Sequence, residues 1–294
     1  MSSRNPRGAR AMRTRPGRPG PVQVIAVTGG KGGVGKTSVS VNLATALAAA
    51  GREVMLFDGD LGLANVDVFL GLSPQYTMAH VLAGERTLDE VVLEAPQGFR
   101  VIPGASGIAT LANLGAVEHL GLVQGFSALA TGLDTLIVDT AAGISHGVLQ
   151  FSQAAQQVLV VLCDEPASLT DAYALVKVLS RNHGVRGFRV LANMVRHRGD
   201  GEMMFRNLER VTGRFLDVTL EFAGEIPDDP WLRRATRAQR TVLEAYPASA
   251  AAQAFKNLAT AADNWPVPEA PRGNVEFFME RLVVNRGPQL RVVQ

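Results

Sequence analysis

Short apolar runs recur along the chain, and each is followed by a turn and then by a stretch with helical periodicity. The apolar residues in these runs are continuous rather than alternating with polar ones, which is typical of strands buried on both faces of a parallel sheet. The predicted strands cover residues 22–28, 53–58, 99–104, 134–140, 157–165 and 188–195. The predicted helices include residues 37–50, 116–131, 168–183 and 203–212.

This alternation of strands and helices predicts an α/β protein with a single doubly wound, mostly parallel sheet flanked by helices. In such a sheet, ligands bind at the carboxyl ends of the strands, where the loops meet. Glycines and polar residues do follow the apolar runs, beginning with GGKGGVGKT after the first run. We therefore expect one domain over residues 22–264, with its site at that edge of the sheet.

The two ends of the chain depart from this pattern. Residues 1–21 hold six arginines, four prolines and no acidic residue, so we expect a disordered tail without the apolar segment of a secretion signal. An electrostatic hold on nucleic acid or acidic lipid is one interpretation of the tail, and a dispensable extension is the other.

A proline-rich linker begins at residue 265, and the sequence GNVEFFMERLVVN follows it. Residues 274–284 predict an amphipathic helix, because apolar residues recur at helical spacing, at Val275, Phe278, Met279 and Leu282. Peripheral binding to a membrane surface is one interpretation of this apolar stripe. Docking of the stripe on the protein's own body is the alternative.

Composition and charge narrow the class of protein. The chain has 294 residues, 47% of them hydrophobic, which is enough for a large core. Without the six arginines of the tail, the chain has 23 basic and 27 acidic residues, so the net charge of +2 becomes −4. The longest apolar runs fall far short of the ~18 residues that span a membrane. Cys163 is the only cysteine, which excludes an internal disulfide and favours a cytoplasmic protein.

Residues 30–37 match the pattern G-x-x-x-x-G-K-[ST], with a predicted strand before and a predicted helix after them. Glycines let backbone N–H groups wrap phosphates, and the helix N-terminus adds its dipole. Lys36 would neutralise the phosphates, and the hydroxyl of Thr37 would bind Mg²⁺. The residues expected to contact the nucleotide here are Gly30, Lys31, Gly32, Gly33, Val34, Gly35, Lys36, Thr37 and Ser38.

Acidic residues follow two other predicted strands. Asp139 ends the run TLIVDT, where an acid can reach Mg²⁺ through water. Asp58 and Asp60 follow the run EVMLF. Asp60 lies farther out of the sheet, and it is our candidate for orienting the water that attacks the terminal phosphate.

Several segments resemble the MinD/ParA family of dimeric ATPases over about residues 22–245. KGGVGKT is similar to the deviant Walker A loop of that family, DGDLGLANVDVFLGL to its switch I, DTAAG to its Walker B and switch II region, and GEIPDDPWLRRA to its adenine-side loop. VIPGASG, CDEPASLTDAYALVKVL and RGNVEFFMERLV further resemble the flagellar number regulators of the FleN/FlhG group. The resemblance implies a MinD-like P-loop NTPase fold and slow, dimer-coupled hydrolysis of ATP to ADP and phosphate.

The resemblance also implies roles for single residues. Lys31 would reach across a dimer interface to the partner's phosphates, and Asp60 would activate water with Asn65 nearby. The implied magnesium ligands are Thr37, Asp60 and Asp139. The residues implied beside the adenine base are Asn193, Pro227 and Asp228.

The implied partners are a second copy of the chain, bound when ATP is present, and a FleQ-like transcription activator of flagellar genes. A FlhF-like GTPase is a further candidate, although residues 1–21 lack the glutamine-containing motif with which some relatives stimulate it. Direct DNA binding is disfavoured because the body is acidic. The implied location is the cytoplasm, with a peripheral position at the inner membrane or the cell pole as an addition.

Two other functions share parts of these motifs. A MinD/ParA-like ATPase that positions cargo on a membrane or nucleoid shares the same switch loops. An iron–sulfur ATPase of the nitrogenase iron-protein type shares the phosphate loop, but its cluster needs two cysteines per subunit and this chain has one.

Overall fold

The computed structural model describes residues 22–105, 116–267 and 276–278, and its centre is one eight-stranded sheet. From edge to edge the strands lie in the order β3-β4-β2-β5-β1-β6-β7-β8, and every neighbouring pair is parallel except β3 with β4. The strands are β1 (Gln23–Thr28), β2 (Val54–Gly59), β3 (Leu93–Glu94), β4 (Arg100–Ile102), β5 (Thr135–Thr140), β6 (Gln157–Cys163), β7 (Gly187–Val195) and β8 (Thr219–Pro227). The predicted fold class is confirmed, and the predicted tail over residues 1–21 lies outside the described residues.

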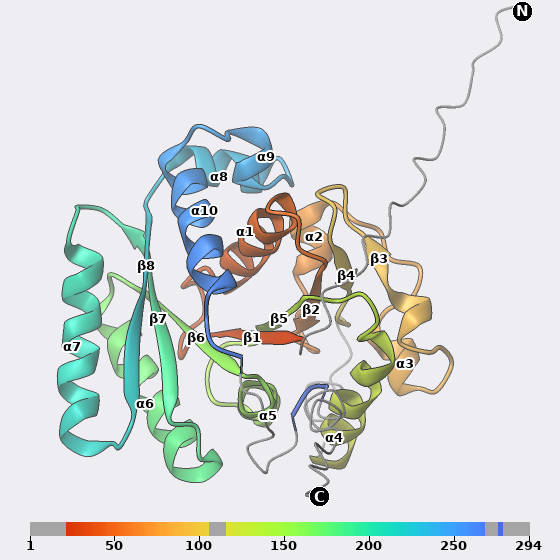
Figure 1. The fold of residues 1–294 in the computed structure, drawn as a ribbon, viewed down its shortest axis with the longest axis horizontal. Coiled ribbons are helices and arrows are strands. Elements are labelled where there is room, and N and C mark those ends of the chain that lie inside the picture. The colour runs from red at the N-terminus through yellow and green to blue at the C-terminus, as the bar shows by residue number, and fades with distance from the viewer. Residues whose placement is uncertain (1–21, 106–115, 268–275, 279–294) are drawn as a thin grey trace, which may run out of the picture.

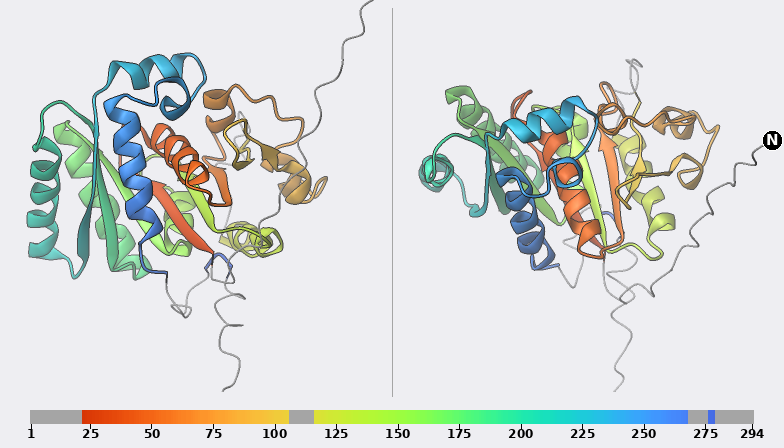
Figure 2. Two further views of the ribbon diagram at one scale, coloured as in Figure 1. Left: turned by 45° about the horizontal axis from the view of Figure 1, so that its top comes forward. Right: turned by 90° about the horizontal axis from the view of Figure 1, so that it is seen from above.

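Helices cover both faces of the sheet, as Figures 1 and 2 show. One face packs against α1, α2 and α8 to α10, and the other against α3 to α7. The helices are α1 (Lys36–Ala49), α2 (Val66–Leu70), α3 (Met78–Leu82), α4 (Ala116–Gly125), α5 (His146–Ala154), α6 (Pro166–His183), α7 (Asp200–Phe215), α8 (Pro230–Arg237), α9 (Val242–Ala245) and α10 (Ala250–Asp263), with the short 3-10 helices η1 (Asp89–Val91) and η3 (Phe126–Leu129).

The apolar positions of the strands account for these two layers. In β1, Val24 and Ala26 belong to the core on the α3–α7 side, whereas Ile25 and Val27 belong to the core around α1. All four side chains are fully buried, so both faces of the strand must be apolar. Helix α1 is buried along most of its length, and its apolar residues are accordingly spread around the helix instead of forming one face.

The six predicted strands are confirmed as β1, β2, β4, β5, β6 and β7, with ends within two residues of those predicted. The sequence does not predict β8, the edge strand, because Glu221, Gly224 and Glu225 interrupt its apolar residues. Nor does it predict β3, which has only two residues. The single helix predicted over residues 116–131 is divided, since α4 ends at Gly125 and η3 follows.

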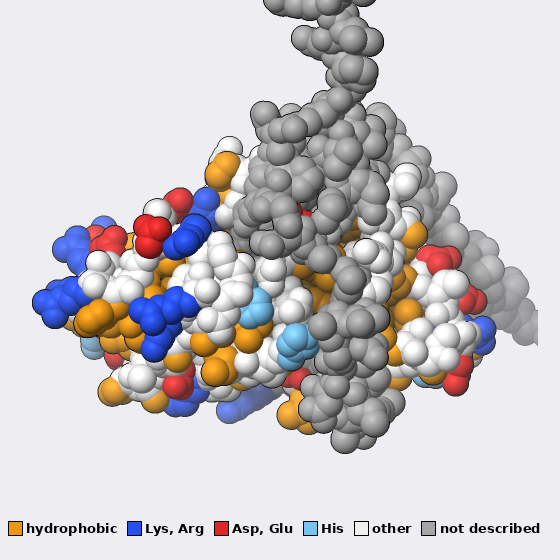
Figure 3. All heavy atoms as spheres, turned by 90° about the horizontal axis from the view of Figure 1, so that it is seen from below, with side chains coloured by type: hydrophobic (Ala, Val, Ile, Leu, Met, Phe, Trp, Pro, Cys, Tyr) orange, Lys and Arg blue, Asp and Glu red, His pale blue; other side chains and the backbone are white. Residues whose placement is uncertain are grey.

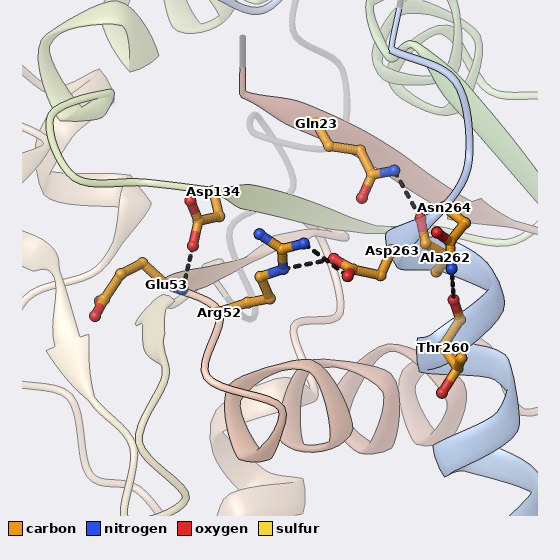
Figure 4. A network of polar contacts seen from close by, with 8 residues as sticks. All are labelled: Gln23, Arg52, Glu53, Asp134, Thr260, Ala262, Asp263 and Asn264. Carbon is orange, nitrogen blue, oxygen red and sulfur yellow. Dashed lines mark hydrogen bonds and ion pairs between the residues drawn. The ribbon is translucent and has the colours of Figure 1, made fainter. Parts of the chain in front are cut away.

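The C-terminal end of α10 is fastened to the beginnings of two strands, as Figure 4 shows. Gln23 Nε2, in β1, donates a hydrogen bond of 2.8 Å to the carbonyl oxygen of Ala262. Arg52, just before β2, donates through Nη2 to Asp263 Oδ2 at 2.6 Å. These contacts hold α10 against α1 and the sheet.

The folded body continues past the predicted domain boundary at residue 264. Trp265 is buried, and the guanidinium carbon of Arg189 lies 4.6 Å from the centre of its ring. Gln157 Nε2, in β6, donates a hydrogen bond of 2.6 Å to the carbonyl oxygen of Pro266. Residues 265 and 266 therefore belong to the body, although the sequence places them in a linker.

Residues 276–278 form a turn, where the sequence predicts the first part of an amphipathic helix over 274–284. Phe278 has a φ of 57°, which a right-handed helix cannot accommodate. Phe277 and Phe278 are buried, and the N–H of Phe277 donates to the carbonyl oxygen of Ala154 at 3.2 Å. At these residues the aromatic side chains dock on the body instead of forming a helix, and the rest of that prediction lies outside the described residues.

Phe277 completes a cluster of aromatic rings beneath the sheet. Its ring centroid lies 5.3 Å from that of Phe126 and 6.4 Å from that of Phe151. Both of these rings also pack against Phe57, at 5.0 and 5.3 Å. Phe57 directly precedes Asp58 in β2, so the cluster joins the 276–278 segment to a strand that carries candidate site residues.

Charged side chains dominate the outer surface of α7, where Glu202, Arg206, Glu209, Arg210 and Arg214 are exposed. Lys and Arg side chains gather at the left of Figure 3, on the side of α7, with Asp and Glu among them. Helix α7 turns Met204 and Leu208 toward the core, so its charged residues remain on the solvent side. Among the described residues, no helix combines the length and the apolar character needed to cross a membrane.

Asp229 connects two helices through one buried carboxylate. Its Oδ1 accepts the N–H of Trp231 at 2.8 Å in α8, and its Oδ2 accepts the N–H of Ala251 at 2.9 Å in α10. Since each such cap contributes about 1 kcal/mol, Asp229→Ala is expected to lower the free energy of unfolding by about 2 kcal/mol. Urea denaturation followed by circular dichroism measures this change. Asp228→Ala is the matched control at an exposed position, and equal losses in both variants would contradict the double cap.

Candidate functional site

The loop between β1 and α1 has an unusual backbone. Gly33 and Gly35 have φ values of 82° and 91°, a conformation that L side chains rarely adopt. Open space surrounds the positions where Gly32 and Gly33 would carry a Cβ. A Cβ on Gly30 would lie 2.2 Å from the carbonyl group of Asp171, so glycine is required there for packing against α6. The loop backbone thus stays accessible at the start of α1, where N–H groups and the helix dipole favour a phosphate.

Lys36 is the first residue of α1, and only 9% of it is exposed. Burial lowers the pKa of the Lys36 ammonium group, while the carboxylates of Asp139 and Asp60 oppose that shift. A phosphate group close to Lys36 would add negative charge and favour the charged ammonium further. This position agrees with the phosphate-neutralising role predicted for Lys36.

Asp139, near the end of β5, holds two hydroxyl groups of α1. Thr37 Oγ1 donates to its Oδ2 at 2.6 Å, and Ser40 Oγ donates to its Oδ1 at 2.9 Å. Burial raises the pKa of Asp139 to about 6, and these two hydrogen bonds act in the opposite direction. Because β5 lies beside β1, the structure brings together two of the three predicted magnesium ligands, Thr37 and Asp139. Their oxygen atoms are ligands that Mg²⁺ prefers.

Asp60, the third predicted magnesium ligand, takes part in a separate turn. Its Oδ1 accepts the N–H of Leu63 at 3.0 Å, and Asn65 Nδ2 donates to the carbonyl oxygen of Leu63 at 2.5 Å. Asp60 and Asn65, the two residues predicted to act on water, are therefore both hydrogen-bonded to the backbone of Leu63. Within residues 22–105, 116–267 and 276–278, no three His, Cys, Asp or Glu side chains are grouped as metal ligands.

Asp58 organises the loop that carries this turn. Its Oδ1 accepts the N–H of Asp60 at 3.1 Å, and its Oδ2 accepts those of Asn65 and Val66 at 2.8 and 3.0 Å. Burial raises the pKa of Asp58, the charge of Asp139 raises it further, and the three N–H groups lower it. Asp58 is thus engaged with its own loop, which leaves Asp60 as the acid able to face a ligand.

Lys31 lies on the exposed part of the phosphate loop, and its ammonium group forms an ion pair with Glu165. This hydrogen bond raises the pKa of Lys31. Glu165 follows β6, the neighbour of β1, so the lysine and its partner come from adjacent strand ends. Within a single chain, Lys31 is therefore paired with a carboxylate, whereas Lys36 is buried at the start of α1. The predicted role of Lys31 across a dimer requires it to leave Glu165.

A pocket of 320 Å³ opens beside the start of α1, between the ends of β7 and β8 and helix α8. Asn193, Pro227 and Asp228, the three residues predicted beside a base, all line it. Asn193 Nδ2 donates to the carbonyl oxygen of Val34 at 2.8 Å. Its Oδ1 is buried and has no hydrogen-bond partner in the described part of the chain. Such an acceptor fits the amino group of adenine, since buried polar atoms are normally paired.

Two residues of the site, Ser40 and Glu165, are not predicted from the sequence. Ser40 lies three residues after Thr37 and hence on the same side of α1, which is the available signal for it. Glu165 belongs to the segment DEP and is the last residue of a predicted strand, near a strand end as the other site acids are. Both residues hold another site residue in place, and local motifs do not reveal such pairing.

The glycine loop, its buried lysine and the strand-end aspartate define a P-loop nucleotide-binding protein. The chain belongs to the CobQ/CobB/MinD/ParA nucleotide-binding domain family, whose model matches residues 25–242. The MinD/ParA resemblance seen in the sequence is therefore confirmed. Membership of this nucleotide-binding family is consistent with ATPase activity.

Individual relatives agree with this assignment. The chain is 57% identical to the antiactivator FleN of Pseudomonas aeruginosa, over 90% of this chain and 94% of FleN. It is 32% identical to the flagellum site-determining protein YlxH of Helicobacter pylori, over 90% of each chain. The structure of MinD from Pyrococcus horikoshii, complexed with Mg-ADP, superposes with a TM-score of 0.68 at 28% identity and covers 83% of this chain and 96% of that one. The MinD-like fold is thereby confirmed.

Proposed function

We propose that this chain binds and hydrolyses ATP and, in its ATP form, restrains a FleQ-type transcription activator and so limits the number of flagella. The observation that carries the proposal is the 57% identity to the antiactivator FleN along 90% of the chain. A positioning role like that of MinD has weaker support, because the MinD structure shares only 28% identity with the chain.

The residues around the phosphate loop have distinct parts in this proposal. The backbone of residues 30–38 would hold the phosphates, and Lys36 would neutralise them. Thr37 and Asp139 would hold Mg²⁺, which supplies positive charge against the phosphate oxygens. Asp60 would orient the attacking water beside Asn65. Since both side chains are bonded to Leu63 in the single chain, hydrolysis requires this turn to rearrange, and a slow rate is expected.

Adenine is the proposed base because of the unpaired Oδ1 of Asn193. This atom can only accept a hydrogen bond, and the 6-amino group of adenine can donate one. Guanine carries a carbonyl oxygen at the same ring position, so two acceptors would face each other there. Pro227 and Asp228 would lie along the base, since they line the same pocket.

We further propose that ATP closes a homodimer. Lys36 already supplies the cation that the phosphates of its own chain need, whereas the side chain of Lys31 is 36% exposed and paired with Glu165. A cation supplied by a second copy stabilises the charge that develops on the transferred phosphoryl group. Dimerisation and hydrolysis are then coupled. The proposed location is the cytoplasm, and the burial of Phe277 and Phe278 on the body disfavours the membrane contact expected through residues 274–284.

The proposed partner gives a direct test. Biolayer interferometry with an immobilised FleQ-type activator is expected to give a Kd at least about tenfold lower with a non-hydrolysable ATP analogue than with ADP. Lys36→Ala is the control. Because this variant should not hold nucleotide, neither the ATP analogue nor ADP should change its Kd for the activator. Equal Kd values with the two nucleotides would contradict the proposed regulation. Failure to bind in both states would contradict the proposed partner.

A further inference from the structure

Strand β7 carries a bulge at the pocket that Asn193 lines. Its register with β8 shifts between Ala192 and Val195, so that Asn193 and Met194 together lie opposite a single residue of β8. Met194 has a φ of 59°, a left-handed conformation that is uncommon for residues other than glycine. Bulges re-aim side chains, and backbone strain of this kind is concentrated at ligand sites. The bulge therefore directs attention to the side chain of Met194.

The two cores of the sheet show what the bulge changes. Leu191 belongs to the core around α1, and Ala192 belongs to the core around α6 and α7. In a regular strand Val195 would share the face of Leu191, because side chains alternate between the two faces. Val195 instead joins the core that contains Ala192. The extra residue thus lets Asn193 and Met194, although consecutive, both line the same pocket.

Both side chains also reach the phosphate loop from this pocket. Asn193 Nδ2 donates to the carbonyl oxygen of Val34 at 2.8 Å, and a Cβ placed on Gly35 would lie 3.5 Å from Met194 Cε. Asn193 is 2% exposed, whereas Met194 is 42% exposed. The pocket therefore receives a fixed polar group from Asn193 and an accessible apolar surface from Met194.

We propose that Met194 packs against the purine ring of the bound nucleotide, together with the apolar side chains of Pro227 and Leu232 that line the same pocket. The inference rests on the proposed nucleotide binding and adds a residue to it. A thioether is polarizable and makes favourable contacts with aromatic rings. Such a contact forms no hydrogen bond, so it does not distinguish the exocyclic groups of adenine and guanine. Met194 supplies affinity for the base, and Asn193 supplies the selectivity.

Met194→Gly tests this contact, because glycine keeps a left-handed backbone without steric cost and only the side chain is lost. Titration with a ribose-labelled fluorescent ATP analogue and Mg²⁺ is expected to give a Kd about tenfold higher than that of wild type. The Kd of unlabelled GTP, measured by competition, should rise by the same factor. The Kd of inorganic tripolyphosphate, which has no base, should stay unchanged. Met194→Leu keeps an apolar side chain and should bind the ATP analogue within about threefold of wild type.

Gln239→Gly is the matched backbone control, because Gln239 has a φ of 54° and does not line the pocket. Its Kd for the ATP analogue should equal that of wild type, whereas Asn193→Ala should lose the preference for ATP over GTP. Wild-type binding of the analogue by Met194→Gly would overturn the inference and leave the proposed ATPase standing. An equal loss of tripolyphosphate binding, or a Met194→Leu variant as weak as Met194→Gly, would also overturn it. A wild-type protein that binds GTP as tightly as ATP would instead overturn the proposed function.

Discussion

Lys31→Ala is expected to bind ATP with a Kd within about twofold of wild type and to hydrolyse it about 100-fold more slowly or worse. In the single chain, Lys31 is partly exposed and paired with Glu165, so the phosphates of the same chain rely on the buried Lys36. The loss appears only when a second copy would supply Lys31 to the reacting phosphate. Titration with a fluorescent ATP analogue measures binding, and phosphate release measures hydrolysis across a range of protein concentrations.

Lys36→Ala and Asp60→Ala are the comparison variants for this experiment. Lys36→Ala should weaken ATP binding about 30-fold or more, because a hydrogen-bonded charge is lost from the phosphate site. Asp60→Ala should bind ATP and dimerise but hydrolyse slowly, so its ATP-bound dimer should persist. Equal binding defects in Lys31→Ala and Lys36→Ala would show that Lys31 acts only as a local charge.

Phe277→Ala is expected to lower the free energy of unfolding by about 3–5 kcal/mol, the usual cost of removing a buried phenyl ring. Phe277 is fully buried, its ring contacts Phe126 and Phe151, and its N–H is bonded to the end of α5. The residue therefore acts as part of the core, although a proline-rich segment separates it from α10. Guanidinium denaturation monitored by fluorescence measures the loss.

Phe215→Ala is the matched control, because Phe215 is 61% exposed at the end of α7. The same truncation there should change the free energy of unfolding by about 0.5 kcal/mol or less. A similarly small change in Phe277→Ala would show that residues 276–278 are not held on the body in solution.

The central part of the sheet is predictable from the sequence because its strands are buried on both faces. Val24 to Val27 must all be apolar, and such a run stands out from its surroundings. Edge strands lack that signal. Strand β8 lies at the edge of the sheet, where the charged residues Glu221 and Glu225 are tolerated. Its sequence therefore lacks a continuous apolar run and does not predict a strand. The turn at Phe278 is hidden for another reason, since the stripe formed by Val275, Phe278 and Leu282 fits a helix and only tertiary burial of Phe277 overrides it.

The site divides in the same way between local and long-range information. Residues 30–37 form a contiguous motif whose backbone geometry depends on local glycines, and the sequence alone indicates it. The pairing of Lys31 with Glu165, and the bonds of Asp60 and Asn65 to Leu63, depend on which loops the fold brings together. Residue types can suggest that such groups take part in a site. They do not show which partner holds each group when the chain is alone.

The rings of Phe57 and Phe277 share the same two neighbours, Phe126 and Phe151. The ribosome, however, adds Phe57 long before it adds Phe277. A ribosome adds about 5–20 residues per second, so Phe57 waits at least about 10 seconds for Phe277 to be made. Until then the nascent chain exposes an incomplete aromatic layer under the strand that leads to Asp58. The aromatic layer is therefore expected to be completed late in synthesis, and chaperones that shield apolar surface should bind its unfinished core on the ribosome.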